Sequence, residues 1–425
     1  MSKVLFLLSL LSLACATHVT WTTPKPSQKP NLVTEFEWKY FDYDWLSPHM
    51  KDYYIKQGLY NPKAILSIDV DRSADGRTFL TTIRDTGVPA SVNTISSKRG
   101  KSGPLLTPYP DWSWYGGVKS CNRHRIVSAF RVAIDTCNRL WVLDTGYIGL
   151  TYTCPAQLLA FDLENDQLVY ETVIPPDVAP NSGEINLLTT PVVQIGETCE
   201  QITVYIADNK HSALLVWDSV SGNTKRIKGR VFGPEKKYTN ITVDGAHFSS
   251  NDGILGMALT PPEHSNENPE LYFTSLASRS IRAINTQDLY EYNGNGTLKL
   301  SKNGIDYLPS QAIAIAFSSK GTLFYSLTKE IGIGCWNLEE PFEAKYFKTA
   351  LQDKNRLQWT SGLKVIECQR DECDSSSSHT PGESKEYLLM TSNRFQKYMT
   401  GTQNLNETNF RVLSIQIEDI QSCPQ

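Results

Sequence analysis

The amino-acid sequence predicts an all-β protein that folds as a single six-bladed β-propeller. The clearest repeating unit begins at Phe130–Gly146 (FRVAIDTCNRLWVLDTG), where apolar residues alternate on both sides of a polar turn. This pattern is typical of a β-hairpin with one buried face. Two further strands are expected at Gln157–Asp162 and Gln167–Ile174. Four antiparallel strands in series, within roughly 45–60 residues and without an intervening helix, are typical of a propeller blade.

The same pattern recurs along the chain, and this recurrence is the second observation that predicts a propeller. The strands of five more units are expected within residues 64–95, 191–227, 253–285, 312–336 and 357–417. Two β-sandwiches are the alternative for a chain of this length. The repeat is continuous, however, and no linker-like break follows Val33. Every blade of a closed ring buries both faces against its neighbours, so a single domain accounts for the whole repeat.

Four stretches depart from the strand pattern. Pro104–Trp114 (PLLTPYPDWSW) is rich in Pro and Trp, which favours a packed loop over a strand. Gln369–Lys385, rich in Ser, Asp and Gly, is expected to be a loop inside the sixth unit. The aromatic run Phe36–Trp45 is expected either to close the ring as a strand or to cap one face. Pro48–Gly58 is expected to form a short helix.

The N-terminal region indicates export. Residues 1–16 combine a basic start, the apolar run Val4–Leu13 and a small-residue cleavage pattern. Together these features predict a secretory signal peptide that is too short to anchor the protein in a membrane. Residues 17–33, rich in Pro, Thr and Lys, are expected to form an extended arm in front of a propeller that covers residues 34–425.

Composition agrees with an exported protein and excludes some classes of partner. The 425-residue chain has a net charge of −4 and no long block of Lys and Arg, so no nucleic-acid or polybasic membrane surface is expected. Of the nine cysteines, Cys15 leaves with the signal peptide. The even remainder favours disulfides but allows roughly a hundred pairings. Asn240, Asn295 and Asn406 begin Asn-x-Ser/Thr sequences and are the expected glycosylation sites.

No motif for catalysis stands out. The chain has no Gly-x-Ser-x-Gly nucleophile elbow and no nucleotide fingerprint, and its seven His residues are scattered. We therefore expect no metal site and no cofactor, and the sequence favours a protein that is not an enzyme. Asp144, Asp208 and Asp252 stand at the ends or starts of apolar strands. Their carboxylates could hold Ca²⁺ at one face of a propeller, but Asp in such places is more typical of turn capping.

Several segments, in order along the chain, resemble the yellow and major royal jelly protein family of insects. They are Trp38–Tyr43 (WKYFDY), Ile68–Arg72 (IDVDR), Gly87–Pro89 (GVP), Gly103–Leu106 (GPLL), Pro108–Trp114 (PYPDWSW), Arg139–Asp144 (RLWVLD), Asp252–Leu259 (DGILGMAL), Gly334–Trp336 (GCW) and Thr360–Lys364 (TSGLK). The Trp-rich segment is more similar to the royal jelly and related yellow-like branch than to the salivary members of blood-feeding flies. The resemblance implies a six-bladed propeller.

The resemblance implies several activities. Members of the family include nutritive glycoproteins, proteins that affect cuticle pigmentation, proteins linked to dopachrome conversion, and salivary proteins that bind biogenic amines in the central channel. We interpret the chain as a secreted, non-enzymatic glycoprotein that binds a small ligand in that channel, such as a biogenic amine, another small aromatic molecule, or a lipid such as a sterol or a fatty ligand. The alternatives are a dopachrome-converting enzyme and a nutritive or structural protein without a ligand. Self-association is left open.

Alignment with the amine-binding members implies three ligand-binding residues. Ser361 falls where those members carry a Thr that hydrogen-bonds the ligand, Asn393 where they carry an amide, and Phe395 where an aromatic ring stacks. Two departures from the family pattern lie beside these positions. Gly362 replaces an acid, and Arg394 adds a positive charge.

The resemblance also implies two disulfides. Cys137–Cys199 would join the turn of one blade to its neighbour, and Cys335–Cys423 would join the fifth blade to the C-terminus. Of the remaining cysteines, Cys121–Cys154 is expected to tie the Pro- and Trp-rich insertion to the second blade. Cys368–Cys373 is expected to close a small loop.

Overall fold

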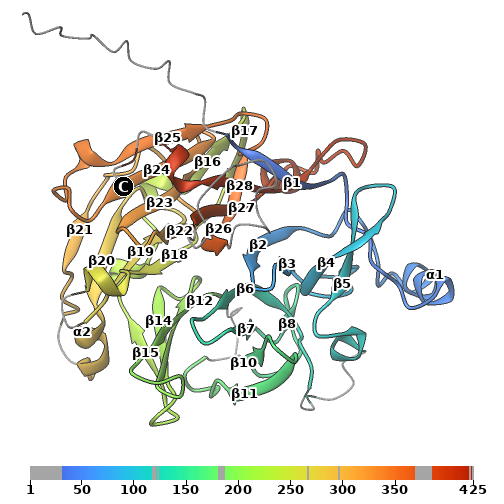
Figure 1. Ribbon diagram of the computed structural model, residues 1–425, viewed down its shortest axis with the longest axis horizontal. Coiled ribbons are helices and arrows are strands. Elements are labelled where there is room, and N and C mark those ends of the chain that lie inside the picture. Colours follow the sequence, from blue (N-terminus) through green and yellow to red (C-terminus); the bar gives the residue numbers. More distant parts are fainter. Residues whose placement is uncertain are drawn as a thin grey trace, which may run out of the picture.

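Six four-stranded antiparallel sheets form a ring, so the predicted six-bladed β-propeller is confirmed (Figure 1). The computed structural model describes residues 31–116, 121, 124–179, 187–265, 268–294, 297–368, 385–420 and 423. Within these residues, no helix is long and apolar enough to span a membrane. The predicted signal peptide lies outside the described residues.

The strands of each blade follow one another along the chain, from the inner strand outward. Blade 1 contains β2 (Ser67–Arg72), β3 (Thr78–Thr82), β4 (Val92–Arg99) and β5 (Pro104–Pro108); blade 2 contains β6 (Ala129–Ile134), β7 (Arg139–Asp144), β10 (Gln157–Asp162) and β11 (Gln167–Val173); blade 3 contains β12 (Leu188–Ile195), β13 (Ile202–Asp208), β14 (Ala213–Asp218) and β15 (Thr224–Lys228). Blade 4 contains β18 (Ile254–Leu259), β19 (Glu270–Ser275), β20 (Ile281–Asn285) and β21 (Lys302–Gly304); blade 5 contains β22 (Ile315–Phe317), β23 (Thr322–Leu327), β24 (Gly332–Asn337) and β25 (Lys348–Gln352). Blade 6 contains β26 (Trp359–Cys368), β27 (Lys385–Asn393), β28 (Phe410–Gln416) and, from the N-terminus, β1 (Val33–Trp38).

Short elements connect and decorate the blades. They are α1 (Pro48–Lys56), α2 (Thr286–Glu291), α4 (Phe395–Met399), and the two hairpins β8 (Tyr147–Ile148) with β9 (Thr151–Tyr152) and β16 (Asn240–Val243) with β17 (Ala246–Ser249). The predicted helix after Pro48 is therefore present. Ser47 caps its N-terminus by accepting a hydrogen bond from the backbone N–H of Met50, and Pro48 occupies the first turn, where a missing N–H is tolerated.

The hydrophobic core lies between neighbouring blades. Trp141 of blade 2 and Trp217 of blade 3 approach to 5.9 Å between ring centroids, and Tyr272 of blade 4 and Trp336 of blade 5 to 6.0 Å. All four side chains are buried. Large aromatic rings fill the wedge between two twisted sheets that diverge toward the rim, so the alternating apolar residues of each strand serve both faces of a blade.

The N-terminus closes the ring. Strand β1 pairs with β28 from Val33↔Ser414 to Trp38↔Phe410, which makes it the outermost strand of blade 6. The closing-strand alternative is thus confirmed for Phe36–Trp38, the first three residues of the aromatic run. The ring of Phe41 extends the contact, with its centroid 4.4 Å from that of Phe410. The expected arm ends earlier than predicted, because Leu32 is already buried in the core.

Three disulfides between described residues reinforce this arrangement. Cys335–Cys423 fixes the C-terminus to β24 of blade 5 across 88 residues of sequence. Cys137–Cys199 joins turns of blades 2 and 3, and Cys121–Cys154 links the segment before β6 to the segment before β10. These are the pairs expected from the sequence. The fourth expected pair, Cys368–Cys373, involves a residue outside the described part of the chain. Most of the loop expected at 369–385 also lies outside it.

The expectation of a packed loop at Pro104–Trp114 was wrong for its first half. Pro104–Pro108 forms β5 and pairs with β4, with Leu106 fully buried. Strand β5 is the outer edge of blade 1, where Pro is tolerated because its nitrogen faces away from the ladder. Trp112 begins a 3₁₀ turn and stacks on Trp45 at 5.0 Å.

A hairpin between blades 3 and 4 stands outside the strands expected from the sequence. Strands β16 and β17 are joined by Asp244-Gly245, both with positive φ, and Ile241 and Val243 are fully buried. The hairpin lies against blades 5 and 6, and β17 contacts α4 (Figure 1). An Asp-Gly pair flanked by alternating apolar residues is a strong hairpin signal that could have located it.

Replacing both Cys335 and Cys423 by Ser is expected to lower the free energy of unfolding by about 2–4 kcal/mol, because the bond restricts the unfolded chain. Denaturant titration of the oxidised protein measures this change. The matched control is the double replacement of Cys121 and Cys154 by Ser, which leaves the C-terminus attached. Limited proteolysis should release C-terminal fragments faster in the first variant only. Equal protection of both variants would contradict the closure role of Cys335–Cys423.

Candidate functional site

Side chains from the inner strands meet on the propeller axis, and Arg131 of β6 lies at their centre. Its guanidinium donates hydrogen bonds to Thr190 Oγ1 (3.1 Å), Leu255 O (3.2 Å), Ile313 O (3.0 Å) and Ser361 O (2.8 Å). These acceptors belong to blades 3, 4, 5 and 6. One side chain of blade 2 therefore links five blades across the axis.

The guanidinium of Arg131 separates two ends of the central channel. We call the side on which the inner strands begin the entry end, and the side on which they finish the exit end. The side chains of Ser361 and Asn393 meet at the entry end. A cavity of about 290 Å³ occupies the exit end, where it is lined by all six inner strands.

Two carboxyls and an ammonium lie at the inner end of this cavity. Lys364 Nζ of β26 donates a hydrogen bond to Val132 O at 2.6 Å and lies 3.4 Å from Asp69 Oδ2 and 3.6 Å from Asp71 Oδ2. The backbone N–H groups of Val132 and Ile134 donate to the same two carboxylates. Burial lowers the pKa of Lys364, but the two carboxylates outweigh burial and hold that pKa above its usual value.

Asp71 is the unusual titrating group of this cluster. Burial raises the pKa of its carboxyl to about 6, against the attraction of Lys364 and with the help of repulsion from Asp69. Burial also lowers the pKa of Arg131, while Asp69 acts in the opposite direction. The channel floor therefore contains two cations facing two carboxyls, one of which titrates close to neutral pH.

The structure brings the three expected ligand-binding residues into one neighbourhood at the entry end. Asn393 Nδ2 donates to Ser361 Oγ (3.1 Å) and to Ser67 O (2.8 Å). The Oδ1 atom of Asn393 is buried and has no hydrogen-bond partner in the part of the chain that the structure describes. Asn393 ends β27, and Phe395 begins α4 two residues later. A buried acceptor without a partner is costly, and a ligand N–H or O–H would satisfy it.

Phe395 belongs to an aromatic cluster that the sequence pattern did not indicate. Its half-buried ring stacks on Trp359 at 4.7 Å between centroids and meets Phe248 of β17 edge-on at 5.4 Å. Tyr398 lies one helical turn further, with its ring 6.4 Å from that of Phe395. The unexpected β16–β17 hairpin thus contributes Phe248 to the candidate site.

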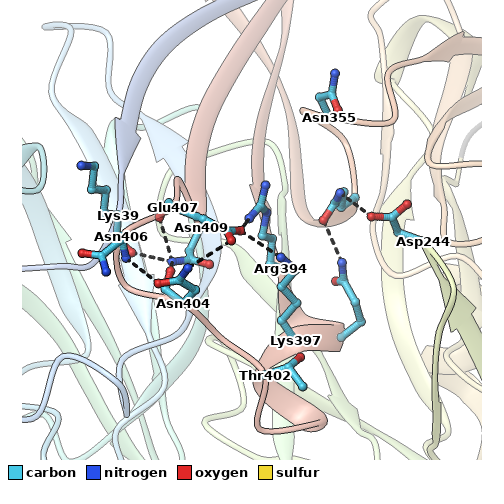
Figure 2. Close-up of polar contacts among 12 residues, drawn as sticks. Lys39, Asp244, Asn355, Arg394, Lys397, Thr402, Asn404, Asn406, Glu407 and Asn409 are labelled. Carbon is cyan, nitrogen blue, oxygen red and sulfur yellow. Dashed lines mark hydrogen bonds and ion pairs between the residues drawn. The ribbon is translucent and has the colours of Figure 1, made fainter.

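The two departures from the family pattern have structural consequences. A Cβ added at Gly362 would lie 2.6 Å from Asp69 Oδ1 and 2.8 Å from Thr391 Cγ2, so a side chain there requires neighbouring atoms to move. Arg394 was expected to add a positive charge beside the site. The structure instead balances that charge with Glu407. Figure 2 shows Arg394 and Lys397 converging on Glu407, with Lys397 Nζ 2.9 Å from Glu407 Oε2. Hydrogen bonds from Lys397, Asn404 and Arg394 lower the pKa of Glu407 to about 2.

The three aspartates considered for Ca²⁺ each have protein partners instead. Asp144 accepts hydrogen bonds from the backbone N–H groups of Val127, Ser128 and Gly146, as expected for turn capping. Asp208 faces His211 and Arg226, and Asp252 faces Lys210. Among the described residues, no cluster of three or more His, Cys, Asp and Glu side chains could hold a metal ion.

Two of the predicted glycosylation sites can be located. Asn240 begins β16 and Asn406 lies in the loop that precedes β28, and both residues are exposed. Figure 2 shows Asn406 beside Asn404, whose Oδ1 accepts the backbone N–H of Asn406 at 3.0 Å. Asn295 lies outside the described residues.

Fold and site together define a class: disulfide-bonded six-bladed propellers whose axis carries the polar side chain of Arg131 and a small cavity on one side of it. A family model described as Major royal jelly protein matches residues 127–423. Major royal jelly protein 9 of Apis mellifera is 37% identical over 395 residues, covering 92% of this chain and 89% of its own. Major royal jelly protein 7 of the same bee is 35% identical over 428 residues, covering 99% and 93%. The chain belongs to the major royal jelly protein family.

Solved structures add only a distant likeness. Virginiamycin B lyase from Staphylococcus aureus is 11% identical, with a TM-score of 0.39, and the match covers 83% of this chain and 96% of that chain. A likeness this weak carries no argument about function.

Replacing Arg131 by Met is expected to lower the free energy of unfolding by about 2–5 kcal/mol, because buried carbonyl groups of Ile313 and Ser361 lose a donor. The matched control is Arg99→Met, which removes an exposed arginine and should change stability little. Denaturant titration measures both variants. Equal stability of the two variants would contradict the bridging role of Arg131.

Asp71→Asn is expected to remove part of the pH dependence of folding. Because the folded state raises the pKa of Asp71 to about 6, the carboxyl binds its proton more tightly in the folded chain. Its contribution to stability is present at low pH and is lost as pH rises through about 6. The stability of the variant relative to the parent should increase by up to about 3 kcal/mol from pH 4 to pH 7.5.

The measurement is a denaturant titration of parent and variant at several pH values. Asp177→Asn, at an exposed position, is the control for loss of one carboxyl. Parallel stability curves for the parent and Asp71→Asn would contradict the assignment.

Proposed function

We propose that this protein is a secreted, non-enzymatic glycoprotein that binds a small aromatic ligand, such as a biogenic amine, at the entry end of its central channel. The observation that carries the proposal is the buried Oδ1 of Asn393, which has no partner among the described residues. The same side chain donates to Ser361 Oγ, and Phe395 follows Asn393 by two residues. A ligand N–H would satisfy this acceptor, and a ligand ring would extend the stack of Phe395 and Trp359.

The chemistry of the entry end favours binding over conversion. Ser361, Asn393 and Phe395 supply a hydroxyl, an amide and a ring, none of which exchanges a proton readily near neutral pH. Proton transfer on an indoline ring would need a positioned acid or base. Dopachrome conversion is therefore the alternative, and an assay of dopachrome turnover distinguishes it from binding.

The charge around this end favours a ligand that does not depend on an ion pair. No acid can replace Gly362 without displacing Asp69 or Thr391, and Arg394 is held by Glu407. Without an ion pair, the main interactions with a ligand would be a hydrogen bond to Asn393 and stacking on Phe395. A neutral aromatic molecule or a sterol thus competes with an amine as the ligand.

Export is supported by the disulfides of the fold, since such bonds persist in oxidising compartments. The exposure of Asn240 and Asn406 leaves both predicted glycosylation sites accessible. The family relatives named above are royal jelly proteins of a bee. A nutritive role without a specific ligand is the outcome expected if no small molecule binds.

Phe395→Ala is expected to weaken binding of the preferred ligand about 2- to 30-fold, the equivalent of about 0.5–2 kcal/mol for a stacked ring or cation–π contact. Isothermal titration of the purified protein with serotonin, dopamine, octopamine and a sterol panel measures this. Tyr290→Ala, which removes an exposed ring on α2, is the matched control and should bind like the parent.

Two outcomes would overturn the proposal. Heats equal to dilution for every ligand would reject a ligand site at the entry end. Saturable turnover of dopachrome that survives repurification, and that is lost on replacing a single acid or His beside the channel, would replace binding by catalysis.

A further inference from the structure

The exit-end cavity is a formed pocket that the proposed entry-end site does not use. Its volume is about 290 Å³, and its lining residues are apolar except for Asp69, Arg131, Thr190 and Lys364. One water molecule accounts for about 30 Å³ of liquid, so the cavity has room for on the order of ten small groups. An apolar pocket with a few convergent polar groups is the usual form of a small-molecule site.

The mouth of the cavity is a ring of apolar side chains that remain partly exposed. Five inner strands contribute one each: Ile134, Val193, Leu259, Phe317 and Val365. Thr190, the single uncharged polar residue of the wall, already donates its hydroxyl to Leu255 O at 2.6 Å. The wall therefore attracts hydrocarbon and offers little to a polar ligand body.

The floor of the cavity carries an ammonium group whose two carboxylate partners lie at long distances. Lys364 has three N–H donors, and Val132 O, at 2.6 Å, takes one of them. The oxygens of Asp69 and Asp71, at 3.4 and 3.6 Å, lie beyond the ~2.7–2.9 Å of a strong charge-assisted hydrogen bond. About a fifth of the Lys364 side chain, 22%, is still accessible. An acceptor that enters through the mouth can therefore reach this ammonium.

We propose that the exit-end cavity is a second ligand site, which takes an unbranched aliphatic carboxylate of roughly six to eight carbons with its head on Lys364. The apolar wall surrounds the chain, and the cavity volume sets the length. Lys364 and Arg131 offer N–H groups to an acceptor head, and the carboxylate of Asp69, which also lines the cavity, already faces Lys364 at 3.4 Å.

The charges at the floor favour an anionic head over a cationic one, most strongly in mild acid. Arg131 and Lys364 balance Asp69 and Asp71 when both carboxyls are ionised. Protonation of Asp71, whose pKa burial raises to about 6, leaves the floor with one net positive charge. The same carboxylate is therefore expected to bind more tightly at about pH 5.5 than at about pH 7.5.

This site is independent of the proposed function. Arg131 lies between the two ends, and neither Ser361, Asn393 nor Phe395 lines the cavity. A ligand at the entry end should therefore not displace one at the exit end, and either site can fail without the other.

The test is isothermal titration of the full chain with octanoate, and with octanol and octylamine as matched ligands of equal length. Octanoate is expected to bind several-fold more tightly at about pH 5.5 than at about pH 7.5. Octanol should bind more weakly at both pH values, and octylamine should give no heat above dilution. No binding of octanoate at either pH, or tighter binding of octylamine, would overturn the proposal.

Two variants connect the binding to this cavity. The double variant Lys364→Met with Asp71→Asn removes one cation and one anion, which keeps the remaining Arg131 and Asp69 balanced. Ala316→Leu instead narrows the cavity without changing any charge. Each is expected to weaken octanoate binding at least about tenfold. Thermal denaturation shows whether each variant folds. If the charge variant does not fold, the result for Ala316→Leu decides whether the cavity is the octanoate site.

The controls distinguish this site from the entry end and from the surface. Phe395→Ala and the exposed Lys345→Met should both bind octanoate like the parent. Loss of octanoate binding in Phe395→Ala would assign the carboxylate to the entry end and overturn the proposal. Unchanged binding in Ala316→Leu would overturn it as well.

Discussion

The guanidinium of Arg131 is the interaction on which the centre of this propeller depends. Inner strands of a propeller face one another across an axis without pairing, so their polar groups need partners from elsewhere. A guanidinium presents several N–H donors in one plane, and here four contacts reach blades 3 to 6. Blade 1 contributes the carboxylate of Asp69, whose negative charge attracts the guanidinium of Arg131. The central channel is therefore two separate ends rather than an open pore.

This division allows the two ends to have different chemistry on one scaffold. The entry end presents neutral groups, with Asn393 and Ser361 beside stacked rings. The exit end presents an apolar wall over Lys364, Asp69 and Asp71. Because the ring fixes the backbone of every inner strand, a few side chains set the chemistry of each end.

Ring closure depends on contacts distant in sequence. Strand β1 reaches blade 6 only because the N-terminal segment pairs with β28, and Cys423 holds the C-terminus against blade 5. Strand β1 and Cys423, near the two ends of the described chain, thus both lie against the last two blades. The β16–β17 hairpin adds a further long-range contact, since it leaves the chain between blades 3 and 4 and packs against α4 of blade 6.

The sequence by itself determined the architecture, because alternating apolar residues and polar turns are local signals that recur in every blade. The expected strands around Phe130–Gly146 and Gln157–Asp162 are present as β6, β7 and β10. The strand at Pro104 was missed, because its prolines are acceptable only at a sheet edge, and edge position is a property of the assembled blade.

Family resemblance predicted Ser361, Asn393 and Phe395 as ligand-binding residues, and the structure places them on β26, β27 and α4, with Asn393 in contact with Ser361. Only the tertiary structure could show that Arg131 crosses the axis, because its partners lie 59 to 230 residues away. The same holds for Asp71, whose pKa is raised by burial. Burial and convergence on an axis are set by how six blades meet, and no local pattern in the chain encodes them.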